Sequence, residues 1–600
     1  MLNVPPRSEL APESTWNAPS VFPSRADWNT AYEQVSAELP SALSRFQGRL
    51  GESSAMLADW FGAAGEMYER VGKAFFYALM AQACDTADQE ANSMASQAGG
   101  LMARFQAAES FADPELLALG EAKLREWVAS EPRLAIYEHY VDDLFRRQQH
   151  VRSAEVEELL GLSGDTFSQI ENTSETLTSS EMPFRAAKSS SGEAVGVTQG
   201  NLDAIYTNAD RDLRRSAYES YTDGHLALKN TLASNYTASV KRDIFLAKAR
   251  RFDTALEASL FSNNIPVEVF QNLVDTFRKN IPTWHRYWDV RRKGLGVDTL
   301  KPYDIWAPIA RQEHHVPYAQ AVDWISEGLK PLGEDYVGAL RQGTLQDRWV
   351  DIYPNLGKRQ GAFSFGWRGL HPFIMMSYHD ELKSMSTLAH ELGHSMHSYL
   401  TWQNQPPIYS DYTLFVAEVA SNFNQAMTRA YLRDAQPDPD FQIALIEEAM
   451  SNFHRYFFIM PTLARFELEV HTRIERGMGV TSDDMNELMA DLFAEGYGES
   501  MSFDRDRIGI TWATFGHLYS NYYVFQYATG ISAAHALAAP ILAGEPGAAE
   551  NYVKFLSAGG SLYPLDALKL AGVDMATPAA VEATFKVLGE MVDRLEKLVG

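Results

Sequence analysis

The stretch 387–400, TLAHELGHSMHSYL, carries three histidines and one glutamate within eight positions. His390 and His394 are four residues apart, so on a helix they lie on one face, one turn from each other, and can reach the same metal ion. Glu391 would lie beside that ion, where a carboxylate can take a proton from water without being a ligand. The motif also contains Gly393, which costs a helix about 1 kcal/mol relative to alanine. We therefore expect a metal-binding helix that another backbone approaches closely.

A catalytic zinc ion needs a third protein ligand. His397 lies about 10.5 Å along the helix from His390, which is too far for Zn–N bonds of about 2.0–2.1 Å. The ligand pattern with glycine at 397 and histidine at 400 is excluded, because position 400 is leucine. An acidic residue on a neighbouring helix remains, and the candidates are Asp411 and Glu418. Asp411 stands where a helix would begin and fits an N-cap. Glu418 lies in the apolar segment LFVAEVASNFNQAM, where a carboxylate needs a partner, so we favour Glu418.

Composition indicates a globular chain with large cores. The 600 residues are 46% hydrophobic and 12% aromatic, and the mean hydropathy is −0.26. The formal net charge of −26 repels nucleic acids and anionic membranes, so we expect neither as a partner. The single cysteine, Cys84, cannot form an intrachain disulfide and is expected to be a small buried residue.

The sequence shows no targeting or membrane signal. Its N-terminus has no basic start followed by an apolar run, so we expect no signal peptide. No stretch reaches 18 uncharged apolar residues, which argues against a membrane span. These features predict a cytoplasmic protein, and the sequence leaves the oligomeric state open.

Three regions follow from the patterns along the chain. Residues 1–25 are rich in proline and serine and are expected to be extended, residues 26–190 form a helical domain, and residues 191–600 form a catalytic region. The Ser/Gly-rich stretch 180–200 near the boundary is interpreted as a short hairpin or a linker. Four short aromatic or β-branched segments predict a small sheet between about 299 and 380: YDIWAPI, RWVDIYPN, GAFSFGWRG and PFIMMSY. Beyond 381 the chain is expected to be helical.

Four segments together resemble the thimet-oligopeptidase-like family of zinc metallopeptidases and, within it, oligoendopeptidase F. They are GKRQGAFSFG (357–366), HPFIMMSYHDELKSMSTLAHELGHSMHSYL (371–400), DYTLFVAEVASNFNQAM (411–427) and HLYSNYYVFQYATG (517–530). The resemblance lies in their order and spacing. It implies a mainly helical, two-lobed fold that encloses a deep substrate channel, with a small β-sheet beside the active-site helix. The segment 373–378 is expected to be an edge strand that pairs with the peptide backbone.

The resemblance also implies one Zn²⁺ per chain. His390, His394 and Glu418 would be its ligands, and Glu391 would be the general base. The sequence departs from the family seven residues after the ligand glutamate, where another glutamate is usual and this chain has Gln425. A neutral amide at this position would orient a ligand histidine more weakly than a carboxylate.

The segment 517–530 is implied to lie over the substrate cleft. His517 and one or more of Tyr522, Tyr523 and Tyr527 would face the scissile peptide. Their chemistry fits, because the attack of water generates an oxyanion, and a phenol or imidazole can donate a hydrogen bond to it without adding a competing acid. Ordinary helix packing is the alternative interpretation for each tyrosine.

The predicted function is hydrolysis of internal peptide bonds in short oligopeptides by a metal-activated water, with Glu391 as base. A metallocarboxypeptidase that trims C-terminal residues would use the same motif and remains an alternative. A non-catalytic helical peptide-binding protein is the second alternative.

Overall fold

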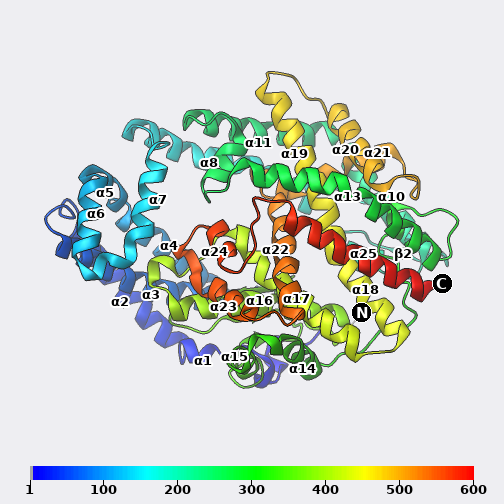
Figure 1. Cartoon of the computed structure of the whole chain (residues 1–600), viewed down its shortest axis with the longest axis horizontal. Coiled ribbons are helices and arrows are strands. Elements are labelled where there is room, and N and C mark those ends of the chain that lie inside the picture. The colour runs from blue at the N-terminus through cyan, green and yellow to red at the C-terminus, as the bar shows by residue number, and fades with distance from the viewer. Residues whose placement is uncertain (1–3) are drawn as a thin grey trace. The chain divides into compact units, whose positions relative to one another are not determined.

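The computed structural model describes residues 4–600 of the chain, which are mainly helical (Figure 1). Two compact units account for the chain, and each is assembled from three separate stretches. Unit 1 comprises Met1–Gln149, His315–Tyr431 and Leu537–Gly572, whereas unit 2 comprises His150–His314, Leu432–Ala536 and Val573–Gly600. The expected domain limits near residues 25 and 190 divide the chain sequentially, whereas these units are discontinuous.

Unit 1 contains the helices on either side of the motif and a small sheet. Its elements are α1 (Ala18–Val21), α2 (Arg25–Ser44), α3 (Ser54–Cys84), α4 (Gln89–Glu109), α5 (Ala112–Leu119), α6 (Glu121–Ser130), α7 (Glu138–Gln148), α14 (Tyr318–Leu329), α15 (Glu334–Leu345), β3 (Val350–Asp351), β4 (Phe363–Phe365), β5 (Phe373–Met375), α16 (Leu382–Asn404), most of α17 (Leu414–Ala435), the end of α22 (Phe525–Leu542), α23 (Ala548–Ala558) and α24 (Pro564–Leu570).

Unit 2 is helical apart from one hairpin. Its elements are α8 (Ala154–Thr176), β1 (Ala187–Lys188), β2 (Ala194–Val195), α9 (Leu202–Tyr206), α10 (Arg211–Ala227), α11 (Lys229–Ala249), α12 (Ala255–Phe261), α13 (Val267–Gly294), α18 (Pro439–His454), α19 (Met460–Glu475), α20 (Ser482–Tyr497), α21 (Arg505–Gly509), most of α22 and α25 (Ala579–Val599). Strands β1 and β2 pair antiparallel, which confirms the hairpin interpretation of the Ser/Gly-rich stretch.

The three-stranded sheet of unit 1 has the order β3-β5-β4. Strand β5 pairs parallel with β3 and antiparallel with β4, and all three of its residues are buried. The prediction that 373–378 is an edge strand is therefore wrong, because β5 is the central strand and both of its backbone edges are paired. The run PFIMMSY is almost wholly apolar, as expected of a strand that is covered on both faces. The edge strand next to the motif helix is β4, which contacts α16.

Helix α16 carries the motif and packs against α17 through a glycine. A methyl group placed on Gly393 would lie 2.3 Å from the carbonyl oxygen of Ala420 and 2.5 Å from the Cα of Ser421. The two backbones can approach this closely only because Gly393 has no side chain. The expected backbone approach is confirmed, and it places the Glu418 turn of α17 beside the two histidines.

Other expectations for local structure have mixed outcomes. The described part of the N-terminal segment contains short helical turns at Arg7–Glu9, Pro12–Ser14 and Ala18–Val21, with extended residues at their ends. Three of the four expected strand segments contain β3, β4 and β5, but YDIWAPI begins within a 3-10 turn, Pro302–Asp304, and holds no strand. Helices α14 and α15 were not anticipated.

The expectation that Cys84 is a small buried residue is confirmed. Cys84 is a buried free thiol at the end of α3. Among the described residues, no helix is long and apolar enough to span a membrane.

Candidate metal centre

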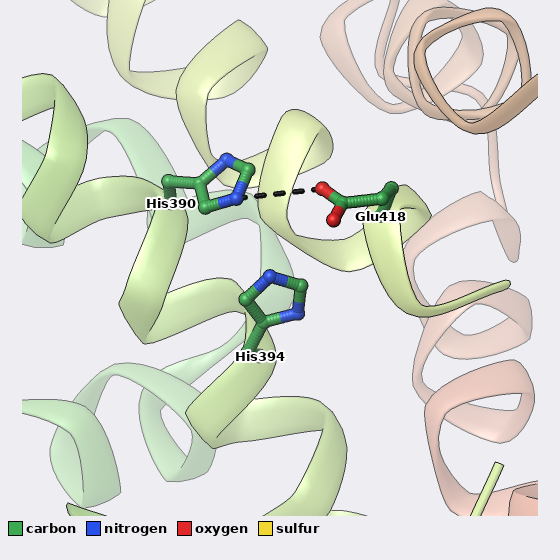
Figure 2. A group of neighbouring side chains, drawn as sticks. All are labelled: His390, His394 and Glu418. Atoms are coloured by element: carbon green, nitrogen blue, oxygen red, sulfur yellow. Dashed lines mark ion pairs between the residues drawn. The ribbon is translucent and has the colours of Figure 1, made fainter. Parts of the chain in front are cut away.

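Three predicted ligands converge in unit 1. His390, His394 and Glu418 each offer one ligand atom, and these atoms all lie within 4.8 Å of one another. Figure 2 shows the two imidazoles on successive turns of α16 and the Glu418 carboxylate reaching toward them from α17. The imidazole centroids are 4.9 Å apart with an interplanar angle of 84°, and His390 Nε2 lies 3.4 Å from Glu418 Oε2. This is the only group of its kind among residues 4–600.

The donor set fits a zinc ion. Two Zn–ligand bonds of about 2.0–2.1 Å at a tetrahedral angle place their donor atoms about 3.3 Å apart, close to the 3.4 Å between His390 and Glu418. Two histidines and one carboxylate are also the ligand types that catalytic zinc sites use. If all three residues bind, one of the four tetrahedral positions would remain for water or substrate.

Gln425 sets the tautomer of His390. The Gln425 amide nitrogen donates to the Ser386 hydroxyl at 2.8 Å and lies 3.3 Å from the Ser386 carbonyl, which can only accept. The amide oxygen therefore faces His390 Nδ1, 3.2 Å away, and that nitrogen must carry the proton. In the neutral ring with this tautomer, His390 Nε2 is an acceptor, 3.4 Å from Glu418 Oε2. Two acceptors at this distance repel each other unless a cation lies between them.

His394 and Glu418 are held by contacts within the same pair of helices. The His394 ring hydrogen-bonds to the backbone of Ala417, one residue before Glu418. Burial lowers the pKa of His394 to about 4, so the ring is neutral at pH 7 and can act as a ligand. One carboxylate oxygen of Glu418 accepts a hydrogen bond from the Ser421 hydroxyl at 3.1 Å.

Glu391 is a buried carboxyl on the same helix as the two histidines. Its side chain lies on the buried side of α16, and the residue is only 6% exposed. Burial raises the pKa of the Glu391 carboxyl to about 7. A positive charge on His390 would lower this pKa, and the negative charge of Glu418 raises it further. The backbone N–H of Ser364 in β4 donates a hydrogen bond to the carboxylate. A second link joins the Ser364 hydroxyl to Ser395 of α16 at 2.8 Å, so the edge strand is tied to the motif helix.

A cavity of about 510 Å³ lies over the three ligand side chains. Its volume is within the range of about 300–1,000 Å³ typical of ligand sites. Residues of β4 and the following turn form one wall, and the start of α17 forms another. The lining residues are Tyr68, Ala362, Phe363, Ser364, Phe365, Gly366, Trp367, Arg368, His390, Glu391, His394, Ser398, Trp402, Ser410, Asp411, Tyr412, Leu414, Ala417 and Glu418.

The two rejected ligand candidates stay outside the cluster. Asp411 lines the cavity but does not belong to the converging group. His397 is 1% exposed and stacks on Tyr412, with ring centroids 3.7 Å apart and an interplanar angle of 8°. Burial lowers its pKa to about 3. His397 is therefore a neutral core residue, and the axial-distance argument against it agrees with the geometry.

The other predicted site residues belong to unit 2. The hydroxyls of Tyr523 and Tyr527 lie 2.7 Å apart, and the His517 ring lies parallel to that of Tyr523 at 6.1 Å. Burial lowers the pKa of His517 to about 4. Tyr522 differs from the others: it is 1% exposed, its backbone has a φ of 48°, and its N–H donates to buried Glu467. Tyr522 is thus a core residue of unit 2, and its expected position facing a substrate does not match its burial.

A family model described as "Peptidase family M3" matches residues 204–587, and one described as "Oligopeptidase F" matches residues 115–184. The chain belongs to peptidase family M3. Within this family its relatives include oligopeptidase PepF of Bacillus subtilis, which is 36% identical over 99% of this chain and 89% of that protein. Group B oligopeptidase PepB of Streptococcus agalactiae is 34% identical over 99% of this chain and 98% of that protein.

Solved structures agree with this M3 assignment. A crystal structure of oligoendopeptidase-F from Enterococcus faecium superposes with a TM-score of 0.73 at 29% identity, covering 96% of this chain and 99% of that chain. A Chlamydophila abortus protein gives a TM-score of 0.90 at 30% identity, covering 99% of this chain and all of that chain. The expected mainly helical oligoendopeptidase fold with a small sheet is confirmed.

Two contributors to the M3 site were not predicted from the sequence. Ser386 orients Gln425, and the backbone of Ser364 holds Glu391. Both residues lie inside segments that carry the family resemblance, but their residue types do not indicate these contacts. A backbone N–H is present in every residue except proline, so the residue type does not reveal that it donates to Glu391. A serine in a helix is usually a surface residue, so Ser386 gave no signal either.

Proposed function

We propose that this M3 family member is a zinc-dependent endopeptidase that hydrolyses internal peptide bonds of short oligopeptides. The observation that carries the proposal is the convergence of His390, His394 and Glu418 beside the buried carboxyl of Glu391. The names of the relatives, oligopeptidase and oligoendopeptidase, support the substrate class. We also propose that it acts in the cytoplasm.

The proposed metal ligands are the two histidines of α16 and Glu418 of α17. A zinc ion held there would supply a Lewis acid that polarises the peptide carbonyl and makes water a stronger acid. Glu391 is the residue that would transfer the proton. With a pKa raised to about 7 by burial, its carboxylate can accept a proton from the attacking water at neutral pH and then give it to the leaving amine. The Ser364 N–H keeps the carboxylate oriented between these two transfers.

His517 and the tyrosine pair Tyr523 and Tyr527 are the proposed hydrogen-bond donors to the oxyanion. His517 is neutral at pH 7, because its pKa is lowered to about 4, so it keeps an N–H to donate without bringing a second acid. The proposal rests on Tyr523 and Tyr527 rather than Tyr522, because Tyr522 is packed in the core of unit 2.

We propose that β4, and not the segment 373–378, pairs with the substrate backbone. It is the edge strand that lies beside α16, and residues 362–366 line the cavity. Pairing through backbone groups gives affinity with weak dependence on the substrate's side chains. This fits a peptidase that acts on many short peptides, and it leaves selection by length to the walls of the site.

The test replaces Glu391 with glutamine and compares the variant with Glu33→Gln, an exposed position in α2. Both proteins are expected to hold one zinc per chain by metal analysis. Glu391→Gln should lower kcat on a quenched peptide by roughly 10²–10⁴-fold, the contribution of a general base, whereas the control should not change it. A ten-residue peptide blocked at both ends should still be cut by the control. An uncut blocked peptide would indicate a carboxypeptidase, and wild-type turnover by Glu391→Gln would refute the role of this residue.

A further inference from the structure

A strained turn precedes the tyrosine pair of unit 2. Residues 520–523 form a turn that is closed by the N–H of Tyr523, which donates to the Ser520 carbonyl at 3.1 Å. Tyr522 is the third residue of this turn, and its φ is 48°. This left-handed conformation suits glycine or asparagine at the third place of a turn and is uncommon for a bulky side chain. Contacts around the turn must therefore hold Tyr522 in it.

One of these contacts comes from a buried carboxyl of α19. The backbone N–H of Tyr522 is not used by the turn and donates to Glu467 Oε1 at 2.7 Å. Glu467 is completely buried. Burial raises the pKa of its carboxyl well above the ordinary value, the hydrogen bond from Tyr522 opposes this shift, and the charge of Asp243 adds to it. The bond therefore joins a strained residue to an acid that is kept out of water.

The Glu467 carboxyl is poorly compensated in this position. Its second oxygen, Oε2, is buried and has no hydrogen-bond partner among residues 4–600. A buried polar atom without a partner lowers stability, so packing alone would favour an apolar side chain here. The carboxyl provides an acceptor for the Tyr522 N–H, which a leucine would lack. We therefore look for its purpose in the geometry of the turn rather than in the packing of the core.

Other helices of unit 2 hold the residues that come before Tyr522. The hydroxyl of Ser259 in α12 donates to the carbonyl of Asn521 at 2.8 Å. The side chain of Arg242 in α11 donates to the carbonyl of Tyr519 at 2.7 Å. These bonds fix the backbone up to Tyr522 and leave its own N–H to the carboxyl of α19.

The conformation of Tyr522 affects the position of the next tyrosine. Tyr523 follows directly, and its hydroxyl lies 2.7 Å from that of Tyr527 in α22. The Tyr523 ring also lies parallel to that of His517, with centroids 6.1 Å apart. The dihedral angles of a residue determine the direction in which the backbone leaves it. A change of Tyr522 to a negative φ would therefore turn Tyr523 away from these two partners.

We propose that Glu467 is a positioning residue for the hydrogen-bond donors Tyr523 and Tyr527. It accepts the N–H of Tyr522, keeps that residue in the left-handed conformation and so holds the tyrosine pair in place to donate to the oxyanion. Glu467 acts through the turn, because its own side chain is buried. The inference rests on the proposed function, in which the pair stabilises the oxyanion, and adds the residue on which the pair's geometry depends.

The first experiment measures the hydrogen bond without using activity. Hydrogen–deuterium exchange of the Tyr522 amide is followed by mass spectrometry in the wild type, Glu467→Gln and Glu467→Leu. Glutamine keeps an acceptor oxygen, so the amide should exchange as slowly as in the wild type, whereas in Glu467→Leu it should exchange about tenfold faster or more. Glu469→Leu makes the same replacement at a half-exposed position of α19 and should leave the exchange unchanged.

The second experiment measures kcat and KM on the quenched peptide. Glu467→Leu should lower kcat about tenfold or more, since removal of one oxyanion donor costs about 10²–10³-fold, whereas KM and the zinc content should stay at the wild-type values. Glu467→Gln should restore kcat. When Tyr523→Phe and Tyr527→Phe are combined, adding Glu467→Leu should lower kcat no further, because the donors through which it acts are already gone.

A second variant covers a failure of the first to fold. Glu467→Met also removes the oxygen acceptor, and its unbranched side chain follows the shape of glutamate more closely than leucine does. It replaces Glu467→Leu in both experiments if that protein does not fold, with the same expected results.

The outcomes separate this inference from the proposed function. If the Tyr522 amide exchanges equally in Glu467→Leu and Glu467→Gln, the carboxyl does not hold the turn and the inference is refuted. It is also refuted if exchange is faster but kcat keeps its wild-type value, or if Glu467→Leu lowers kcat equally with and without the two tyrosine hydroxyls. If the combined Tyr523→Phe and Tyr527→Phe variant keeps the wild-type kcat, or if the wild type cuts no peptide, it is the proposed function that fails.

Discussion

The close approach of α16 and α17 at Gly393 offers a direct test of how the metal site is built. In Gly393→Ala the new methyl group would lie 2.3 Å from the Ala420 carbonyl oxygen, whereas Cβ atoms are essentially never found within 3.0 Å of another heavy atom. The neighbour is backbone and cannot rotate away, so the two helices must move apart by at least about 0.7 Å. Glu418 lies only two residues before Ala420 and moves with it.

The displacement is large compared with the tolerance of the site. Metal–ligand distances are held to within about 0.2 Å, so a shift of about 0.7 Å removes Glu418 from a proper ligand position. We expect zinc affinity to fall at least tenfold, comparable to the 10–100-fold loss when a supporting residue is removed. Overpacking should also lower the free energy of unfolding by about 1–3 kcal/mol.

The assay measures zinc affinity by chelator competition and thermal stability by calorimetry. The matched control is Gly338→Ala in α15, because a methyl group at Gly338 meets no heavy atom within 4 Å and the substitution should stabilise the helix by up to about 1 kcal/mol. Both proteins are assayed with and without added zinc. If Gly393→Ala binds zinc as tightly as the control and melts no earlier, the helix contact does not position Glu418 and the reasoning is refuted.

Three further predictions concern neighbouring groups. Gln425→Ala removes the acceptor that fixes the His390 tautomer, so zinc affinity should fall about 10–100-fold by chelator competition, whereas Gln425→Glu should keep it. Metal analysis should find no stoichiometric zinc in Glu418→Ala but one zinc per chain in His397→Gln, and equal metal contents would contradict the ligand assignment. Burial raises the pKa of the Glu109 carboxyl to about 7, so its contribution to stability is complete below the unfolded-state pKa of about 4.3 and is lost as pH rises through about 7. The wild-type Tm should therefore fall relative to Glu109→Gln between pH 5 and pH 8, and parallel melting curves across this range would show that burial does not act on Glu109.

Local spacing was enough to predict the motif helix. Two histidines four residues apart share a helix face whatever surrounds them, because the helix repeat sets that geometry. The same repeat excluded His397 on axial distance, and the apolar surroundings of Glu418 favoured it over Asp411. The family resemblance supplied the oligoendopeptidase fold, which the comparisons bear out.

Strand order shows where sequence reasoning reaches its limit. The segment 373–378 is apolar enough for a strand, but being central or at an edge depends on which partners pair with it, and those partners are not neighbours in the sequence. The division of the chain into two discontinuous units has the same origin, because contacts between distant stretches define it. Domain boundaries placed at single positions, such as those expected near residues 25 and 190, divide a chain into consecutive segments and do not describe units built from separate stretches.

Side-chain chemistry and helical spacing are local properties, so the amino-acid sequence alone indicated the candidate ligands and the candidate base. How these residues meet depends on contacts between distant segments: Gly393 lets α17 approach, Gln425 accepts from His390 Nδ1, and β4 rather than β5 presents an edge. These features depend on packing between segments far apart along the chain, and packing is set by the whole fold rather than by any one stretch.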